Sequence, residues 1–305
     1  MSQRLKADLG LAFATVIWGA TFVVVKEALN HASVFAFMAI RFALATVVMA
    51  GIYARSMRHF TRRDLWAGAQ IGFFMFAGYA FQTLGLRLTT PSKAGFITGF
   101  SVVLVPLLMA MLWGRKSNAW VWGGALAALV GLYYLSVPAE GFAALNQGDL
   151  LVLGCAAVFA FHIIFVGLYT PNHSVAALSL IQVATTGVLS LAALPLLSVT
   201  GWEPLRLVWT PSLMWAVVIT AVGATAIAFT VQVWAQKYTT ATHTAILFSL
   251  EPVFAALTSY LVLNERLSPR ALFGAALILF GIVLAELKGP TQATPESPTA
   301  LTQSV

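Results

Sequence analysis

The stretch from Leu150 to Trp202 contains no Lys, Arg, Asp or Glu. A soluble domain cannot bury so long an apolar run and still cover its surface with polar groups, because soluble domains carry roughly 25% charged residues. The whole chain shares this composition: of its 305 residues, 60% are hydrophobic and 9% are charged. Lipid accepts an apolar exterior, and helices satisfy their own backbone hydrogen bonds within it. The sequence therefore predicts an all-α integral membrane protein.

Charged and turn-forming residues divide the chain into ten apolar segments. Each is close to the roughly 20 residues that a membrane-crossing helix needs. The pair Pro171–Asn172 divides the charge-free stretch into the sixth and seventh segments. The expected spans are about 8–29, 34–53, 65–86, 92–113, 119–137, two within 150–202, 212–236, 241–263 and 270–287. Residues 288–305 are rich in Pro, Thr, Ser and Gln, and we expect a disordered cytoplasmic tail there.

The basic residues between the segments predict the orientation of the chain, because cytoplasmic loops carry an excess of Lys and Arg. With a cytoplasmic N-terminus, ten basic residues fall inside: Arg4, Lys6, Arg55, Arg58, Arg62, Arg63, Arg115, Lys116, Lys237 and Lys288. Four fall outside: Arg87, Arg206, Arg266 and Arg270. Counting Lys26 and Lys93 with the outside group does not reverse the difference. Both termini are therefore expected in the cytoplasm, and the net charge of +7 indicates topology rather than nucleic-acid binding.

An internal repeat relates the two halves of the chain. A shift of 150 positions places spans three to five on spans eight to ten without gaps; it matches Gln82 with Gln232, Thr89–Thr90 with Thr239–Thr240, Gly124 with Gly274 and Gly131 with Gly281. A shift of 141 extends the match weakly, placing Asp8 on Asp149 and Trp18 on Phe159. Membrane helices resemble one another in composition, but a gap-free register over this length favours a duplication. Residues 1–137 and 148–287 then form two five-helix repeats, joined by a loop at 138–147.

Five is an odd number, so the second repeat is expected to enter the membrane in the opposite orientation to the first. Inverted repeats are common in secondary transporters, which bind substrate near the bilayer midplane at the repeat interface. One chain already holds both repeats, so the fold does not require an oligomer.

Short motifs add a family resemblance over about residues 8–287. Trp18–Gly19 followed by Phe22, the stretch Leu88–Phe96, and Glu251–Ala256 followed by Asn264–Leu267 resemble the signatures of EamA-type proteins, which belong to the drug/metabolite transporter superfamily. The resemblance implies a ten-helix fold of two inverted repeats around a central cavity. It also implies transport of small metabolites such as amino acids, often outward. The first repeat has Arg115–Lys116 where the second has Glu265–Arg266, so a role for that acidic residue does not extend to the first copy.

Polar residues inside the spans are the first candidates for a site, because a charge at the bilayer centre costs roughly 2.5–3.5 kcal/mol on insertion scales. Arg41 is either an anion contact for a substrate carboxylate or a structural or snorkelling side chain. Lys93 and His243 align in the repeat; they are either interfacial or entrance residues at two gates. Gln82 and Gln232 also align, and amides of this kind either join helices or orient a substrate.

Histidine and aromatic side chains extend the candidate set. His162 lies in the middle of span six and is either a helix-packing hydrogen bonder or a proton relay. Ligand sites are mostly apolar with a few polar groups, so some aromatic residues should line the site. The aromatic candidates are Trp18, Phe22, Tyr79, Phe96, Phe165 and Trp234. Packing or contact with lipid is the alternative interpretation for each of them.

Glu251 is the only acidic residue well inside an expected span, and Pro252 follows it. Proline lacks a backbone N–H and disturbs a helix, and such a break is tolerated in a membrane only where protein or water surrounds it. Ser101 takes this position in the first repeat. We expect burial to favour the protonated carboxyl, so that a proton can bind and leave during a cycle. The alternative is a permanently hydrogen-bonded carboxylate, paired with Arg41 or His243, that braces the break.

These features favour a secondary transporter, expected as an exporter in a bacterial cytoplasmic membrane, whose partners are a small-molecule substrate and the bilayer. A membrane-embedded enzyme or lipid-processing protein is the alternative; it would need clustered acids, a Ser/His set or metal ligands, whereas the polar residues here are scattered. A signalling or scaffold protein would have larger segments outside the membrane. The sequence contains no nucleotide-binding or metalloprotease motif, and its single cysteine, Cys155, is expected to be a packed thiol. No cofactor or metal site is expected.

Overall fold

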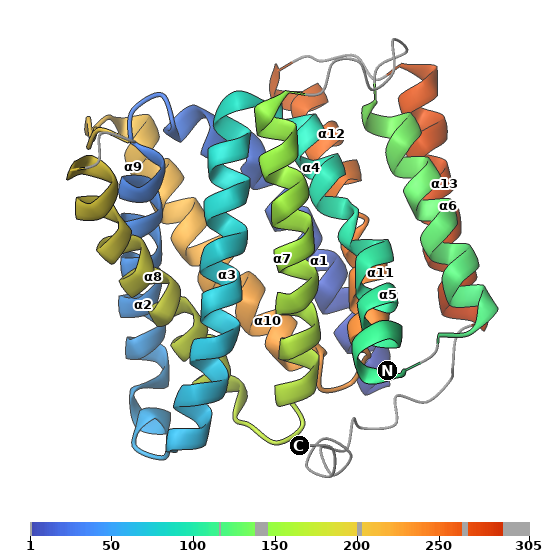
Figure 1. Ribbon diagram of the computed structural model, residues 1–305, viewed down its shortest axis with the longest axis horizontal. Helices are drawn as coiled ribbons and strands as arrows, with labels where there is room; N and C mark the ends of the chain where they lie inside the picture. Colours follow the sequence, from blue (N-terminus) through green and yellow to red (C-terminus); the bar gives the residue numbers. More distant parts are fainter. Residues whose placement is uncertain (1, 116, 138–145, 200–202, 264–267, 289–305) are drawn as a thin grey trace.

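The computed structural model describes residues 2–115, 117–137, 146–199, 203–263 and 268–288 (Figure 1). Within these ranges the chain is helical, apart from one isolated bridge between Ala32 and Leu207. The elements are α1 (Gln3–Ala28), α2 (Val34–Met57), α3 (Arg62–Leu88), α4 (Pro91–Gly99), α5 (Ser101–Trp113), α6 (Ala119–Ser136), α7 (Gln147–Tyr169), α8 (Val175–Val199), α9 (Pro211–Val218), the π-helical segment η2 (Ile219–Ile227), α10 (Ala228–Ala235), α11 (Ala241–Phe248), α12 (Glu251–Leu263) and α13 (Pro269–Lys288).

Seven helical segments of the described chain are long and apolar enough to cross a membrane. Two shorter apolar helices, Ala119–Tyr134 and Leu272–Ala285, lie in α6 and α13. Helix α3 has 27 residues but carries Gln70 and Gln82 and is not among the seven. The protein is therefore a multi-pass membrane protein. Part of the expected loop (138–145), the second half of the repeated motif (264–267) and the expected disordered tail (289–305) lie outside the described residues.

Side-chain caps fix where several helices begin. Thr61 with Asp64 and Asn146 with Asp149 form reciprocal capping boxes at α3 and α7, which satisfy backbone N–H groups that have no partner within the helix. The repeat-related residues Thr90 and Thr240 cap α4 and α11. Equivalent residues of the two halves therefore start equivalent helices.

The fourth and ninth expected spans are each interrupted at the same repeat position. Helix α4 ends at Gly99 and α5 begins at Ser101, while α11 ends at Phe248 and α12 begins at Glu251. The sequence predicted a disturbance at Pro252 only. The first repeat has Val102 at that position, so its break occurs without a proline. The breaks place Ser101 and Glu251 in the first turn of a new helix.

The eighth expected span is regular at its ends but not in its middle. Between α9 and α10, η2 widens the helix, and the Thr225 hydroxyl donates to the carbonyl of Thr220, five residues earlier, at 2.8 Å. A π-helical turn changes the direction of the backbone groups and is frequent at functional sites. The sequence offered no signal for this segment.

Helices α6 and α13 are repeat-related and lie side by side at one edge of the bundle (Figure 1). A Cβ added to Gly124 would lie 2.5 Å from the carbonyl oxygen of Gly281, and one added to Gly131 would lie 2.6 Å from that of Gly274. Only glycine permits so close an approach of two backbones. Because Gly124 is equivalent to Gly274 and Gly131 to Gly281, the contact is reciprocal.

The helix ends gather at two opposite ends of the bundle. In Figure 1, α1, α3 and α6 begin at the lower end, whereas α7, α9 and α13 begin at the upper end. In the same view the start of α1, the end of α2 and the start of α3, the helix ends that carry Arg4, Arg55 and Arg62, lie at the lower end.

Candidate functional site

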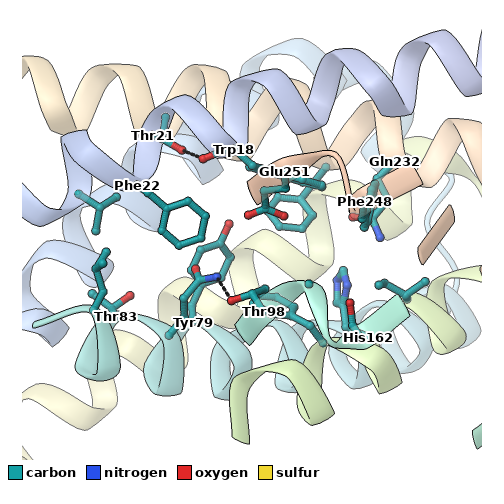
Figure 2. A pocket seen from close by; sticks show the side chains of 18 of the residues that line it. Trp18, Thr21, Phe22, Tyr79, Thr83, Thr98, His162, Gln232, Phe248 and Glu251 are labelled. Atoms are coloured by element: carbon teal, nitrogen blue, oxygen red, sulfur yellow. Dashed lines mark hydrogen bonds between the residues drawn. The ribbon is translucent and has the colours of Figure 1, made fainter. Parts of the chain in front are cut away.

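A cavity lies between the two halves of the chain (Figure 2), and together with the open space at its mouth it holds about 730 Å³ of empty space. Its lining residues are Trp18, Thr21, Phe22, Val25, Arg41, Tyr79, Gln82, Thr83, Leu86, Thr98, Gly99, Ser101, Phe159, His162, Ile163, Phe229, Gln232, Phe248 and Glu251. These residues come from α1, α2, α3, α4, α5, α7, α10, α11 and α12.

The lining follows the internal repeat. The shift of 141 relates three pairs of lining residues: Trp18 with Phe159, Thr21 with His162, and Phe22 with Ile163. The shift of 150 relates four more: Tyr79 with Phe229, Gln82 with Gln232, Thr98 with Phe248, and Ser101 with Glu251. The cavity is therefore built from equivalent positions of the two halves, although the residue types differ in most pairs.

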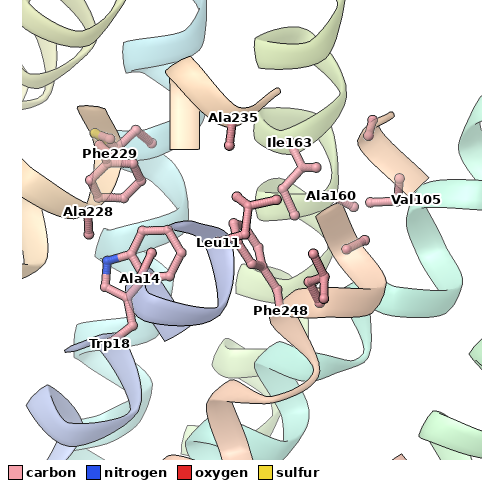
Figure 3. Close-up of a cluster of buried hydrophobic side chains, with 14 of the residues drawn as sticks. Leu11, Ala14, Trp18, Val105, Ala160, Ile163, Ala228, Phe229, Ala235 and Phe248 are labelled. Carbon is pink, nitrogen blue, oxygen red and sulfur yellow. The ribbon is translucent and has the colours of Figure 1, made fainter. Parts of the chain in front are cut away.

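Trp18 is held by the π-helical segment. Its indole Nε1–H donates to the carbonyl oxygen of Ala224 at 2.8 Å. The ring centroid lies 5.1 Å from that of Phe229 and 5.0 Å from that of Phe248, the latter in an edge-to-face arrangement. Such pairs stabilise an aromatic wall beyond their buried area. A buried apolar cluster adjoins this wall and includes Leu11 and Ala14, one to two turns earlier on α1 (Figure 3).

Gly19 brings α1 directly against α12. A Cβ at this position would lie 2.6 Å from the carbonyl oxygen of Glu251 and 2.7 Å from Cβ of Phe254. Any larger residue would separate the two helices. The Trp18–Gly19 pair therefore places the indole and the acidic residue on adjoining walls of the cavity.

Arg41 is buried, with 3% of its surface exposed, and is engaged from several sides. Its Nε donates to the Thr225 hydroxyl at 2.9 Å, and its Nη2 donates to the Tyr79 hydroxyl at 3.2 Å. The guanidinium also lies over the rings of Tyr79 and Phe42, at 4.7 and 5.2 Å from their centroids. These contacts support the structural interpretation of Arg41, although it lines the cavity.

Glu251 lines the cavity as the first residue of α12. Its carboxylate has no hydrogen bond or ion pair with any described residue. Arg41 bonds Thr225 and Tyr79, and His243 bonds Asp8. Neither residue therefore forms the pair with Glu251 that the alternative interpretation of Glu251 predicts. Figure 2 shows the carboxylate directed into the space between the aromatic side chains.

Amide and imidazole groups complete the polar lining. Gln82 Nε2 donates to the Thr98 hydroxyl at 3.3 Å, as Figure 2 shows. His162 Nε2 lies 2.9 Å from Gln182 Oε1. Gln232 Nε2 donates to Gln236 Oε1 at 3.0 Å, whereas Gln232 Oε1 is buried and accepts from none of the described residues.

Lys93 and His243 lie outside the cavity lining and form two equivalent pairs. His243 Nε2 lies 3.1 Å from Asp8 Oδ1, and Lys93 Nζ lies 3.7 Å from Asp149 Oδ2. Asp8 and Asp149 are repeat-related, as are His243 and Lys93. The Asp8–His243 pair joins the starts of α1 and α11, and the Lys93–Asp149 pair joins the starts of α4 and α7, at opposite ends of the bundle (Figure 1). We call them the two end pairs.

Three aromatic candidates also lie outside the lining. Phe165 packs against Phe74, Trp113 and Tyr169. Trp234 contacts Tyr238, and Phe96 is partly buried against the apolar core. Each helix residue turns by about 100°, so Trp234 points away from the direction of Gln232, and Phe96 away from that of Thr98. The sequence could not show which face of each helix points to the cavity, because these helices are apolar on every face.

Several lining residues were not among the sequence candidates, notably Thr21, Thr83, Thr98, Phe159, Phe229 and Phe248. The repeat contained a signal for some of them, since the equivalents of Trp18 and Tyr79 are Phe159 and Phe229. Cys155 is buried, as expected, with Sγ 3.9 Å from the Thr98 hydroxyl. Among the described residues no three His, Cys, Asp or Glu side chains are grouped as metal ligands.

Comparison with known proteins supports the same picture. The EamA-like transporter family matches the chain twice, at residues 5–137 and 146–287. An uncharacterized transporter of Archaeoglobus fulgidus is 37% identical over 286 residues, covering 94% of this chain and 87% of that protein. The uncharacterized transporter YetK of Bacillus subtilis is 23% identical, covering 94% and 89%.

Two further proteins are also similar to the chain. A WAT1-related chloroplastic protein of Arabidopsis thaliana is 26% identical, covering 88% of this chain and 66% of its own length. A solved crystal structure shares the fold with a TM-score of 0.74 at 22% identity, covering 92% of this chain and 96% of that one. The family match extends over nearly the whole chain in two copies. The chain belongs to the EamA-like transporter family.

Proposed function

We propose that the protein is a secondary transporter that moves small organic metabolites, such as amino acids or related compounds, across the membrane by alternating access. The observation that carries this proposal is a cavity lined by equivalent residues of the two halves. When one inverted repeat moves against the other, a site between them opens first to one side of the membrane and then to the opposite side. Export from the cytoplasm is the direction that the family resemblance favours.

The architecture of this proposal is ten membrane spans in two inverted five-helix repeats, residues 1–137 and 148–287. The opposite starting ends of α1 and α7 in Figure 1 and the reciprocal glycine contacts of α6 and α13 support it. The basic helix ends gathered at one side support cytoplasmic termini in a bacterial inner membrane. One chain contributes both halves of the cavity, so transport does not require an oligomer.

The two end pairs support alternating access. Each joins the first repeat to the second, because Asp8 and Lys93 belong to the first and His243 and Asp149 to the second. Separation of one repeat from the other at either end must break the pair at that end. Breaking the two pairs in turn would expose the cavity to the two sides in turn.

Glu251 is the proposed coupling residue. Its carboxyl group faces the cavity and has no partner among the described residues, so a proton can reach and leave it without breaking a hydrogen bond to them. Ser101 occupies the equivalent position, so the coupling group exists in one repeat only. An enzymatic or lipid-processing activity has no comparable support, because the imidazole of the lining, that of His162, contacts Gln182 rather than a lining hydroxyl that it could activate as a nucleophile.

Flux assays with the full-length protein in proteoliposomes test the proposal. A panel of amino acids and amines is offered under an imposed pH gradient, with the wild type, Glu251→Gln and Glu27→Gln compared at equal incorporation. Glu27 is a matched control, because it is an exposed glutamate at the end of α1. We expect the pH gradient to drive uptake or release in the wild type and in Glu27→Gln, and not in Glu251→Gln.

Two outcomes contradict parts of the proposal. If no compound of the panel moves faster than through protein-free liposomes, the transporter assignment fails for these substrates. If gradient-driven transport persists unchanged in correctly folded Glu251→Gln, Glu251 is not the coupling site.

A further inference from the structure

The charges of the cavity are not equally available to a ligand. Arg41 uses two of its three nitrogens in hydrogen bonds within the protein, and two aromatic rings cover the guanidinium. Glu251 has no hydrogen bond or ion pair with a described residue. The cavity therefore presents an unpartnered carboxyl group, which is negative once its proton has been released, whereas its positive group is largely occupied.

A second unpartnered group in the lining is also an acceptor. Gln232 is 1% exposed, and its Oε1 has no hydrogen-bond partner in the described part of the chain. Its orientation is fixed by a chain of bonds: Gln236 Nε2 donates to the carbonyl oxygen of Ile163 at 2.9 Å, so Gln236 Oε1 must accept from Gln232 Nε2. A backbone carbonyl only accepts, so reversing either amide would oppose two acceptors or two donors. A buried acceptor left unsatisfied costs free energy that a ligand N–H can recover.

Aromatic rings surround these two acceptors. Trp18, Tyr79, Phe159, Phe229 and Phe248 line the cavity, and Figure 2 shows Glu251 among them. The faces of such rings attract organic cations, more strongly when water is excluded. An apolar wall with a few polar groups also selects a substrate whose body is itself apolar.

We propose that the cavity binds a protonated primary or secondary amine that carries an apolar group about the size of a phenyl ring. The ammonium group of this ligand lies at Glu251 and, where the shape of the ligand permits, donates an N–H to Gln232. This inference rests on the proposed transport function and names the substrate class of the same cavity. The chemistry follows from the unpartnered groups, which both accept hydrogen bonds. A carboxylate-bearing substrate would bring a further acceptor to a site whose guanidinium is already engaged.

Four probes share a phenyl group and differ in their charged group, so they distinguish an amine site from a site for a quaternary ammonium, a zwitterion or a carboxylate. They are 2-phenylethylamine, trimethyl(2-phenylethyl)ammonium, phenylalanine and 3-phenylpropionate. Binding to the purified full-length protein in nanodiscs is measured by isothermal titration calorimetry at pH 8.5. Alkylammonium groups resemble that of Lys, with a pKa of about 10.4, and therefore keep their proton at this pH. The variants are Glu251→Gln, Gln232→Leu and the control Glu27→Gln, and the same probes are tested for flux in proteoliposomes.

We expect 2-phenylethylamine to bind at least about tenfold more tightly than phenylalanine or 3-phenylpropionate, since a hydrogen bond to a charged group is worth about tenfold or more in affinity. Glu251→Gln should weaken amine binding by about tenfold or more, and Glu27→Gln should not change it. Gln232→Leu should weaken binding of the primary amine severalfold but leave the quaternary ammonium unaffected, because that ion has no N–H to donate.

Tighter binding of phenylalanine or 3-phenylpropionate than of 2-phenylethylamine would overturn the inference, as would unchanged amine binding in Glu251→Gln or binding of none of the four probes. Transport of the anion or the zwitterion without the amine would leave the transport function standing and refute the substrate class. Amine binding with no flux of any probe would support the site and count against transport.

Discussion

Asp149→Asn is the most direct test of the end pairs. The Asp149 side chain is buried, with 1% of its surface exposed, and its carboxylate lies 3.7 Å from Lys93 Nζ. The carboxylate also accepts hydrogen bonds from the Thr89 hydroxyl at 2.5 Å and from the backbone N–H of Asn146 at 3.0 Å. The substitution preserves the shape of the side chain and one acceptor oxygen. It removes the charge and therefore the attraction that joins α4 to α7 at this end.

The size of the effect follows from these contacts. Hydrogen bonds to charged groups contribute roughly 1.5–3 kcal/mol, against about 0.5–1.5 kcal/mol for neutral ones. Replacing the carboxylate by an amide should therefore weaken closure of this end by about 1–2 kcal/mol. That difference changes the ratio of closed to open molecules by a factor of about 5–30.

Cysteine labelling measures this ratio. Thr21→Cys on a Cys155→Ala background places a thiol in the cavity lining, and a small polar thiol reagent is added from one side of the membrane at a time. Asp149→Asn should accelerate labelling from the side at which α4 and α7 begin. Asp8→Asn should accelerate it from the opposite side, because Asp8 forms the equivalent pair with His243.

Asp64→Asn is the matched control for Asp149→Asn. Asp64 also forms a capping box, with Thr61, and lies 2.7 Å from His173, but it belongs to the start of α3, at the opposite end of the bundle from the starts of α4 and α7. Loss of this carboxylate should therefore leave labelling from the side of α4 and α7 unchanged. Equal labelling rates in Asp149→Asn and Asp64→Asn, or labelling that rises from the wrong side, would refute the role of the end pairs.

Three other substitutions or fusions test the fold and the site. Trp18→Phe removes the donor to the Ala224 carbonyl and should lower the free energy of unfolding by about 1–3 kcal/mol, measured by thermal denaturation in detergent; no change would mean that water replaces the indole. Gly131→Ala should destabilise the protein more than Gly123→Ala in the same assay. A Cβ at Gly131 would lie 2.6 Å from a backbone oxygen, whereas a Cβ at Gly123 would make an ordinary contact, 3.5 Å from a Leu284 methyl group. Equal effects would contradict the close packing of α6 and α13. Reporter proteins fused after Arg58 and after Val137 should report opposite sides of the membrane, and a common side would contradict the proposed topology.

The all-helical membrane class of this chain could be predicted with little ambiguity, because solvation by lipid restricts a spanning segment to a long apolar helix. The internal repeat could be recognised in the sequence for a related reason. Gly124, Gly131, Thr90 and Gln82 recur at one spacing, and two copies of one fold need the same close contacts, caps and polar positions.

The composition of the cavity was predictable only in part. Trp18, Phe22, Tyr79, Gln82, His162, Gln232, Arg41 and Glu251 were candidates and line it. Phe96, Phe165 and Trp234 were equally plausible aromatics and pack elsewhere. In a soluble helix the polar face reveals which side is buried, but a membrane helix is apolar on its lipid face and on its protein face alike, so periodicity does not distinguish the two.

Composition and spacing were therefore enough to predict the class of protein, the duplication and the short set of polar residues inside apolar segments. Tertiary structure decided which of those polar groups have partners. Arg41 is satisfied by Thr225 and Tyr79 from distant helices, His243 by Asp8 across 235 positions, and Glu251 by no described residue. The physical reason is that burial and hydrogen bonding depend on groups brought together from far along the chain. The π-helical turn that presents Ala224 to Trp18 exists only as part of that packing.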